Sequence, residues 1–595
     1  MIATTYTRLY RYSFIARYQI YDIQKRVTFP LANATVNTSE PLEVQLVMWA
    51  PKGNGFAYVY LNNVYYRPSA ESTIEYQLTT DGVRNYVYNG VPDWVYEEEV
   101  LASNSAMWFS PDGQKLAYAS FNDTSVPVMT VPFYGAASSP KFQYPHPVNI
   151  RYPKVLFFTA KFYLKVHCCE ILVNHLNKIA TRLRICTLFL QLYKLDESNG
   201  WIEIDKAPVF SEDGKHMLLV LPHLDPSGSD KYPHITRLST EVPKESVPLT
   251  EGAFSVNHIH DISRQRFTQH PEQLHFFVTS DGLDASSKSP ECLSCKLKLS
   301  SGSPCTYVVV SGSPGNSHFA LTCVGPGPAE ASFTTRLFSS WESNEVVRRK
   351  LQEIKLPTVK YLRAPIERTD IKAYVKLLLP PNLDTSGKTK YPLLVHVYGG
   401  PKSNLAVDTF KMDWNHYLAI NKSVIIAHID GRNSGLKGQK MLFAGYRRLG
   451  TVEIFDQINV TRYLQNTLPY IDKSRTAIWG WSYGGYATAM ALAQDVNNVF
   501  QCGVSVAPVT DWVYYDTIYT ERYMGLPIIE DNVMGYIGAS LNNKQSMMLS
   551  RQLELKDIMF QQMSYPDEEH GLVGVRPHFY HTLTRFISDC FHLDQ

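Results

Sequence analysis

The stretch Ile478-Trp479-Gly480-Trp481-Ser482-Tyr483-Gly484-Gly485 joins two segments of different character. The residues before it, Thr476 to Trp479, favour a β-strand, and the small apolar residues after it, Tyr486 to Gln494, favour a buried helix. A serine between two glycines, at the turn from a strand to a helix, is typical of a nucleophile elbow. The alternative is a glycine-rich turn that merely contains a serine. The flanking strand and helix favour the elbow.

Gly480 and Gly484 are expected where the turn leaves no room for a side chain. Such a turn pushes the Ser482 hydroxyl out at the top of the sheet, and the next helix aims its N-terminus at developing negative charge. Ser482 is therefore the candidate nucleophile.

The C-terminal part of the chain alternates between strands and helices. Apolar runs typical of buried parallel strands are found at Tyr391–Val397, Ser423–Ile429, Thr476–Trp479 and Cys502–Val506. Val452 to Leu468 supplies a helix before the elbow. Together with the elbow, this pattern predicts a doubly wound α/β-hydrolase sheet over residues 351–595. A charged, helix-compatible run around Glu345 to Leu356 marks the boundary.

The N-terminal part repeats a different unit. Met48-Trp-Ala-Pro-Lys-Gly53, Met107-Trp-Phe-Ser-Pro-Asp-Gly113 and Val209-Phe-Ser-Glu-Asp-Gly214 each lead into a second apolar run. Strand, turn and strand at distant positions in the sequence indicate the blades of a multi-bladed β-propeller over residues 1–350. Generic hairpins of a β-sandwich are the alternative. Residues 155–194 resemble no blade, and their apolar runs are too short and too charged for a transmembrane helix.

Length and composition limit the class of protein. A chain of 595 residues exceeds what one core usually supports, so two domains are expected. A formal net charge of only +2 argues against a nucleic-acid partner. Nine cysteines and five Asn-x-Ser/Thr acceptors favour an extracellular compartment. The acceptors are Asn33, Asn37, Asn122, Asn421 and Asn459.

The first residues, Met1 to Arg8, contain no apolar export signal. A lost N-terminal segment would reconcile this with secretion. A secreted protein or a type II cell-surface protein is then expected, with any membrane anchor in the lost segment.

Four cysteines, Cys292, Cys295, Cys305 and Cys323, have a spacing that could suit a zinc knuckle. In a chain with glycosylation acceptors, disulfides are the better interpretation. His258-Ile-His260 is a lone pair without further partners, so we expect no metal ligand there.

A serine nucleophile needs a base, an orienting carboxylate and an oxyanion hole, in the chain order Ser, acid, His for α/β-hydrolases. His570, in Asp567-Glu-Glu-His-Gly571, is the candidate base. It follows a strand-like run, Met559 to Tyr565, and precedes a last helix, His578 to Phe591. A surface histidine is the alternative.

Several long strings resemble the dipeptidyl peptidase IV family of prolyl-oligopeptidase-type serine peptidases. They are Gly480-Trp-Ser-Tyr-Gly-Gly485, Ala507-Pro-Val509, Tyr514-Tyr-Asp516, Tyr519-Thr-Glu-Arg-Tyr-Met-Gly-Leu-Pro527 and Asp93-Trp-Val-Tyr-Glu-Glu-Glu-Val100. The resemblance implies a propeller fused to an α/β-hydrolase, a homodimer, no cofactor and no metal. It also implies release of Xaa-Pro or Xaa-Ala dipeptides from the N-termini of peptides.

Residue roles follow from the same resemblance. Glu98 and Glu99 match the acidic pair that binds the substrate's α-ammonium, and Arg11 matches an arginine that binds its first carbonyl. Tyr398 matches the oxyanion-hole tyrosine, with the backbone N–H of Tyr483 as the second donor. The residues that resemble the lining of the proline pocket are Tyr483, Val509, Trp512, Tyr515 and Tyr519. The implied disulfides are Cys292–Cys295, Cys305–Cys323 and Cys502–Cys590.

One segment departs from the family. Between Asn532 and Lys544 the family places a strand followed by the triad aspartate, whereas this chain passes almost directly into a helix-like run, Gln545 to Leu553. Asp531 matches a non-catalytic aspartate, so we assign no triad acid. A lost exon or a shorter isoform would explain the pattern. Two functions therefore remain open, a serine dipeptidyl peptidase and a catalytically impaired relative that binds or regulates.

Overall fold

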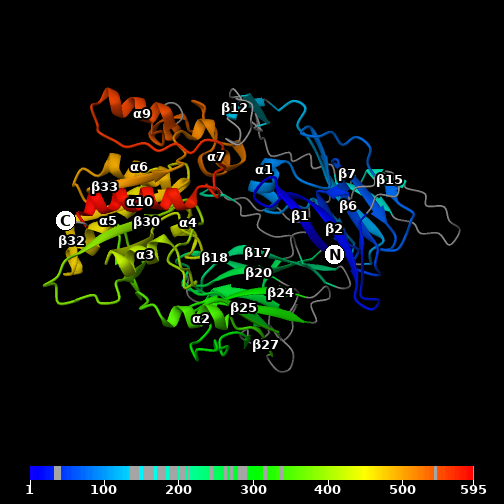
Figure 1. Cartoon of the computed structure of the whole chain (residues 1–595), viewed down its shortest axis with the longest axis horizontal. Helices are drawn as coiled ribbons and strands as arrows, with labels where there is room; N and C mark the ends of the chain where they lie inside the picture. The colour runs from blue at the N-terminus through cyan, green and yellow to red at the C-terminus, as the bar shows by residue number, and fades with distance from the viewer. Residues whose placement is uncertain are drawn as a thin grey trace. The chain divides into compact units, whose positions relative to one another are not determined.

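The computed structural model describes residues 1–31, 42–110, 112–126, 128–133, 146–151, 166–170, 182–185, 199–201, 209–211, 215–239, 246–259, 264–268, 272–278, 291–312, 318–333, 339–541 and 546–593. Asn33, Asn37 and His260 lie outside these ranges. The chain forms two compact units, and Figure 1 shows its elements. One unit contains residues 1–190 and 516–519, and the other contains residues 191–515 and 520–595.

The first unit is built from small antiparallel sheets. One contains β1 (Ile2–Arg8), β2 (Phe14–Asp22), β3 (Val27–Pro30) and β4 (Glu43–Val44). The next contains β5 (Leu46–Trp49), β6 (Phe56–Tyr60), β7 (Asn63–Arg67) and β8 (Tyr76–Gln77). Another contains β9 (Val87–Asn89), β10 (Met107–Phe109), β11 (Lys115–Asn122), β14 (Val166–Glu170) and β15 (Arg182–Ile185). A hairpin contains β12 (Val128–Phe133) and β13 (His146–Arg151).

Two short stretches of residues 155–194, where the sequence shows no blade pattern, belong to one of these sheets. β14 pairs antiparallel with β11, and β15 pairs with β14, so both extend a blade sheet. Backbone hydrogen bonding to an existing edge does not require the alternating pattern that sequence analysis looks for.

Three blade sheets belong to the second unit. They contain β16 (Val209–Phe210), β17 (His216–Leu224), β18 (Lys231–Ser239) and β19 (Ser246–Pro248), then β20 (Ser255–Ile259), β21 (Arg264–Thr268), β22 (His275–Val278) and β23 (Glu291–Cys292), and finally β24 (Tyr307–Gly312), β25 (Phe319–Gly325), β26 (Glu330–Phe333) and β27 (Ser339–Glu342).

The three repeated hairpins of the sequence share one register. Trp49 lies opposite Phe56, Phe109 lies opposite Leu116, and Phe210 lies opposite Met217. Each pair is separated by seven positions, so the same turn length closes each hairpin. The repeat predicted from the sequence is therefore a structural repeat.

An α/β sheet follows the blades in the second unit. Its strand order is β28 (Thr358–Pro365), β29 (Lys372–Leu379), β31 (Ile425–Asp430), β30 (Tyr391–Val397), β32 (Ile471–Trp481) and β33 (Cys502–Val506). β31, β30, β32 and β33 are parallel, as predicted. The helices in and beside this region are α2 (Glu345–Gln352), α3 (Trp414–Asn421), α4 (Gln439–Leu442), α5 (Val452–Thr467), α6 (Tyr483–Gln494), α7 (Thr517–Met524), α8 (Val533–Gly538), α9 (Ser546–Leu555) and α10 (Arg576–Phe591).

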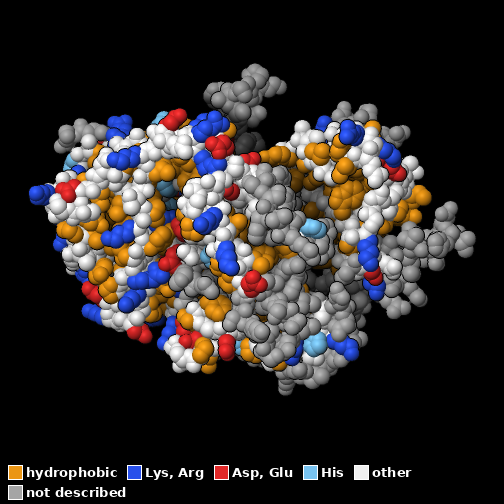
Figure 2. Space-filling model, turned by 90° about the horizontal axis from the view of Figure 1, so that it is seen from below, with side chains coloured by type: hydrophobic (Ala, Val, Ile, Leu, Met, Phe, Trp, Pro, Cys, Tyr) orange, Lys and Arg blue, Asp and Glu red, His pale blue; other side chains and the backbone are white. Residues whose placement is uncertain are grey.

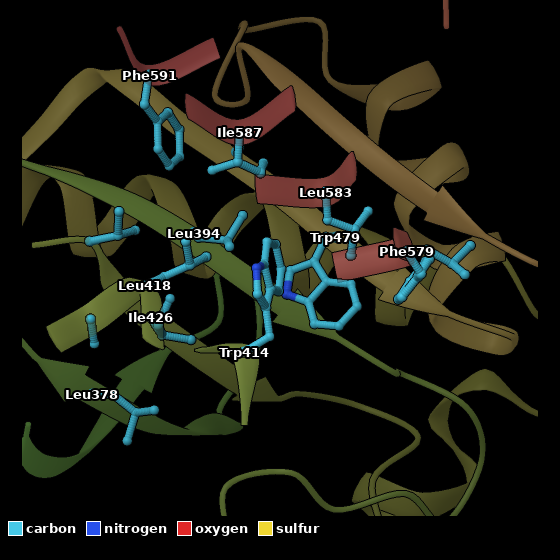
Figure 3. Close-up of a cluster of buried hydrophobic side chains, with 14 residues drawn as sticks. Leu378, Leu394, Trp414, Leu418, Ile426, Trp479, Phe579, Leu583, Ile587 and Phe591 are labelled. Atoms are coloured by element: carbon cyan, nitrogen blue, oxygen red, sulfur yellow. The ribbon is translucent and has the colours of Figure 1, made fainter. Parts of the chain in front are cut away.

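Helices α3 and α10 cover one face of this sheet. Figure 3 shows Leu394 and Trp479 of the sheet packed with Leu418 of α3 and Leu583 of α10. Side chains alternate along a strand, so the fully buried Val395 points to the opposite face. Helices α5 and α6 pack on each other and on the strands, as the doubly wound prediction requires.

The compact units do not coincide with the predicted domains at 1–350 and 351–595. Within the second unit, blade residues bond directly to the α/β region. Asp408 N donates to Glu272 O at 2.8 Å, Phe410 N donates to Val324 O at 2.8 Å, and Arg363 forms an ion pair with Glu272. These bonds join the later blades to the α/β sheet in one unit.

All three predicted disulfides are present, Cys292–Cys295, Cys305–Cys323 and Cys502–Cys590. The last one ties α10 to β33, at the edge of the sheet. On the face shown in Figure 2, basic and acidic side chains are interspersed over the described surface. Among the described helices, none combines the length and apolar character needed to cross a bilayer.

Two half-buried histidines of the α/β sheet have lowered pKa values. His396 stacks on Trp479 at 4.3 Å between ring centroids, and its ring lies 5.1 Å from His428. Burial lowers the pKa of His396 to about 4, and burial followed by the charge of His396 lowers the pKa of His428. Both rings are therefore neutral in the folded protein at pH 7.

We predict that acid destabilises the fold through these rings. Between about pH 6.5 and pH 4 the unfolded chain binds protons that folded His396 does not, so the free energy of unfolding falls as the pH falls, by about 3 kcal/mol for that ring. His428→Gln should reduce the difference in urea stability between pH 7 and pH 5, whereas the exposed His581→Gln should not. Equal pH dependence in all three proteins would contradict the prediction.

We also predict unequal contributions from the disulfides. Cys502 and Cys590 are 88 residues apart, and Cys292 and Cys295 are three apart. Chain entropy assigns about 4–5 kcal/mol to the long loop and about 2 kcal/mol to the short one. Serine replacement of each pair, followed by guanidinium unfolding, measures the difference. A larger loss from the Cys292–Cys295 pair would be inconsistent with it.

Candidate active site

The turn at Ser482 has the strained backbone of a nucleophile elbow. Ser482 lies between β32 and α6 with φ 62° and ψ −119°, and its N–H donates to Val506 O at 2.9 Å. A Cβ on Gly480 would lie 2.5 Å from Val397 O, and one on Gly484 would lie 2.2 Å from the same atom. Glycine is therefore required at both positions, as predicted.

Tyr398 follows β30 beside this turn. Its ring lies 6.0 Å from the ring of Tyr483, and its side chain is partly exposed. A Cβ on Gly400 would lie 2.9 Å from the Tyr398 ring and 3.0 Å from the Tyr483 ring. The lack of a side chain at Gly400 therefore allows the rings of Tyr398 and Tyr483 to approach each other.

The predicted pocket residues from the second unit come together as an aromatic cluster. Trp512 is buried and lies 5.3 Å from Tyr483 and 5.8 Å from Tyr515, between ring centroids. Val509 is half-buried on the segment after β33. Tyr519 belongs to the residues grouped with the first unit, where its N–H donates to Asp516. Its position at the pocket stays a prediction.

Sequence analysis missed Glu453. Its carboxylate accepts a hydrogen bond from the Tyr483 hydroxyl at 2.9 Å, and it is 1% exposed near the start of α5. Burial raises its pKa, against hydrogen bonds from the Gly450 backbone and from Tyr483. Glutamate is common in the first turn of a helix, where it interacts favourably with the helix dipole, so no sequence signal distinguishes this residue.

His570 lies next to the nucleophile turn. The indole N–H of Trp481, the residue before Ser482, donates to the carbonyl oxygen of His570 at 3.1 Å. The two rings are 6.5 Å apart, and the imidazole is exposed. The structure therefore brings the candidate base and the candidate nucleophile to the same end of the sheet.

The segment after Asn532 is helical where the family was expected to have a strand. Val533–Gly538 forms α8, and residues 542–545 lie outside the described part. Asp531 forms an ion pair with Arg447. The strand predicted at Met559–Tyr565 is wrong, since these residues are irregular and Met559 is 92% exposed. In the described sheet β33 is the edge strand, and Met559–Tyr565 does not pair with it.

The predicted acidic pair lies in the first unit. Helix α1 (Trp94–Tyr96) continues into a π-helix, η1 (Glu97–Leu101), which carries Glu98 and Glu99. Glu98 forms a two-point ion pair with Arg11, with Nε to Oε2 at 2.7 Å and Nη2 to Oε1 at 2.6 Å. Sequence analysis named both residues but did not predict that they pair. Their position relative to Ser482 stays a prediction.

A pair of buried carboxyl groups supports this helix. Asp93 caps α1 by accepting from Tyr96 N at 2.8 Å, and Asp123 lies against it. Burial, and then the charge of Asp123, raise the pKa of Asp93 to about 7.

One cluster in the described residues has metal-ligand chemistry, His275 with Cys292 and Cys295. The two sulfurs form a disulfide with each other, so they are not thiolate ligands here. The zinc-knuckle interpretation of these cysteines is therefore set aside.

The described glycosylation acceptors differ in exposure. Asn122 and Asn421 are exposed. Asn459 is 3% exposed on the inner face of α5, and its Oδ1 accepts from Glu367 N at 3.1 Å. A glycan has no access to that side chain in the folded chain, which corrects the prediction for Asn459.

Comparisons with known proteins agree with this arrangement. Residues 1–170 and 166–329 match the dipeptidyl peptidase IV N-terminal region, and residues 410–546 match the prolyl oligopeptidase family. Venom dipeptidyl peptidase 4 of Vespula vulgaris is 37% identical, over 98% of this chain and 83% of the relative. Human prolyl endopeptidase FAP is 32% identical, over 100% and 85%.

A solved structure has the same fold. Dipeptidyl peptidase 4 of Porphyromonas gingivalis superposes with a TM-score of 0.80 at 24% identity, over 99% of this chain and 88% of that one. Fold, motifs and full-length relatives lead to one assignment: the chain belongs to the dipeptidyl peptidase IV family of serine peptidases, with a propeller region followed by an α/β-hydrolase region.

Proposed function

We propose that this chain is a serine exopeptidase that releases Xaa-Pro or Xaa-Ala dipeptides from peptide N-termini, with its turnover lowered by the altered acid segment. The observation that carries the proposal is the strained Ser482 turn, which lies beside Tyr398 and is joined to His570 through Trp481. A relative named prolyl endopeptidase supports a preference for proline.

The proposed mechanism uses these residues in the order of a serine peptidase. Ser482 Oγ attacks the carbonyl carbon of the second residue while the His570 imidazole takes the hydroxyl proton. The Tyr398 hydroxyl and the Tyr483 N–H donate to the resulting oxyanion. His570 then protonates the leaving amine, and water hydrolyses the acyl-enzyme by the reverse roles.

Specificity is assigned to two regions. We assign the proline pocket to Tyr483, Trp512 and Tyr515, with Val509, because such a rigid aromatic slot suits a flat proline ring and excludes larger side chains by shape. Glu98 and Glu99 bind the free α-ammonium, and Arg11 binds the first carbonyl. No cofactor or metal takes part in this mechanism. We further propose an extracellular location, because several relatives are named venom dipeptidyl peptidase 4, and a homodimer by family resemblance.

A catalytically impaired protein that binds peptides is the second candidate. It is favoured by the helix at Val533–Gly538 and by the engagement of Asp531 with Arg447. Both leave the triad acid of the family without an assigned counterpart in this chain.

We predict that the chain as written labels weakly with a serine-directed fluorophosphonate. Loss of the acid behind the catalytic histidine costs about 10⁴-fold in kcat in serine proteases. Insertion of the family's strand-and-aspartate segment after Asn532 should restore labelling and release of Gly-Pro, and Ser482→Ala should abolish both. Strong labelling of the unrestored chain would show that another carboxylate, such as Asp567, orients His570.

A second prediction concerns the acidic pair in the restored chain. Glu98→Ala or Glu99→Ala should lower kcat/KM on Gly-Pro substrates by two or more decades, about 3 kcal/mol, because the substrate's charge loses its partner. Glu43→Ala is the matched control, since Glu43 forms an ion pair with Arg17 in the same sheet as Arg11's turn. Unchanged kinetics would assign the acidic pair to an ordinary solvated surface.

A further inference from the structure

The turn Leu9–Ser13, between β1 and β2, carries Arg11 at its tip. Leu9 N and Tyr10 N both donate to Ser13 O, at 2.9 and 3.3 Å. Arg8 donates from Nε to Tyr10 O at 2.9 Å and from Nη2 to Arg11 O at 2.6 Å. The guanidinium of Arg8 thus holds the carbonyl groups on one side of the turn.

Glu97 holds the amide side of the same turn. Its Oε1 accepts from Tyr12 N at 2.6 Å and from Ser13 N at 3.1 Å, and its other carboxylate oxygen accepts from the Ser13 hydroxyl. Glu97 is fully buried, so these charge-assisted bonds form away from competing water. It is also the residue before Glu98 in η1.

This arrangement explains why the exposed Arg11 side chain forms an ordered ion pair with Glu98. The Arg11 side chain is 58% exposed, and surface ion pairs of that kind usually gain little because two long side chains lose freedom. Here the backbone on both sides of Arg11 is fixed, so less freedom remains to be lost on pairing. Arg11, Glu98 and Glu99 together carry a formal charge of −1, which matches a single ammonium group.

We propose that Glu97 and Arg8 are positioning residues that clamp the turn Leu9–Ser13, and that this clamp sets recognition of a peptide's free N-terminus by Arg11, Glu98 and Glu99. The inference rests on the proposed function, and it concerns binding rather than the chemical step. Neither positioning residue needs to touch the substrate.

The test uses the full-length chain with Ser482→Ala, so that no peptide is consumed. Two peptides labelled at the C-terminus, Ala-Pro-Ala-Lys with a free amine and its N-acetylated form, are titrated by fluorescence anisotropy. The ratio of the two Kd values isolates the contribution of the amine. A general loss of folded protein changes both Kd values together and leaves this ratio unchanged.

The clamp predicts a specific series. The parent should prefer the free amine by at least tenfold, and Glu97→Ala should reduce that ratio below threefold. Glu97→Gln should keep it, because the amide oxygen can accept the two N–H groups while its NH₂ donates to the Ser13 hydroxyl. Arg8→Met, a change at an exposed position, should reduce the ratio as well. Glu43→Ala should leave it unchanged.

Two results would overturn the inference. One is an unchanged ratio of the two Kd values in Glu97→Ala or in Arg8→Met, in a variant whose thermal unfolding transition shows that it is folded. The other is a parent that does not distinguish the two peptides, which would remove the amine site itself. Dipeptide release by the restored chain is measured separately, so failure of the clamp and failure of the peptidase proposal are distinguishable.

Discussion

The close approach of helix α6 to strand β30 is the constraint on which the hydrolase site depends. Gly480 and Gly484 both face Val397 O, and a side chain at either position would separate the helix from the sheet. The contact forces Ser482 into a positive φ, a strain that only the surrounding packing can hold. The same contact places Tyr398, which follows Val397 in the chain, beside Tyr483. The proposed nucleophile, oxyanion donors and pocket wall therefore all depend on one close backbone approach.

The consecutive glutamates Glu97, Glu98 and Glu99 lie in one π-helical turn, and they have different partners. In the π-helix η1, Glu97 points into the fold and binds the amides of the turn at Ser13, whereas Glu98 reaches Arg11. π-Helical turns are rare and are often found at functional sites, because the extra residue per turn redirects side chains. The sequence alone does not distinguish the buried glutamate from its neighbours.

Much of the hydrolase region could be predicted because strong local signals agreed there. The apolar runs at β30 and β33 and the Gly-x-Ser-x-Gly turn each specify their element through burial or sterics, and the disulfides followed from family resemblance. Predictions failed where structure depends on a partner. Met559–Tyr565 has a strand-like pattern but pairs with no strand of the described sheet. β14 pairs with β11 through backbone hydrogen bonds that the sequence pattern does not predict, and β15 pairs with β14 in the same way. Glu453 and Glu97 were missed because their roles depend on distant residues.

The parts of the site differ in how much they depend on the altered segment. The Ser482 turn is held by β30, by α6 and by Val506 O of β33, all of which precede Asn532. Arg11 and Glu98 are held within the first unit. His570 follows the altered segment, and support for its loop comes from Trp481 on the elbow itself. In the proposed mechanism the altered acid segment therefore affects proton transfer, whereas the Ser482 turn and the proposed amine site keep their own supports. We therefore expect this chain to bind peptides without hydrolysing them efficiently.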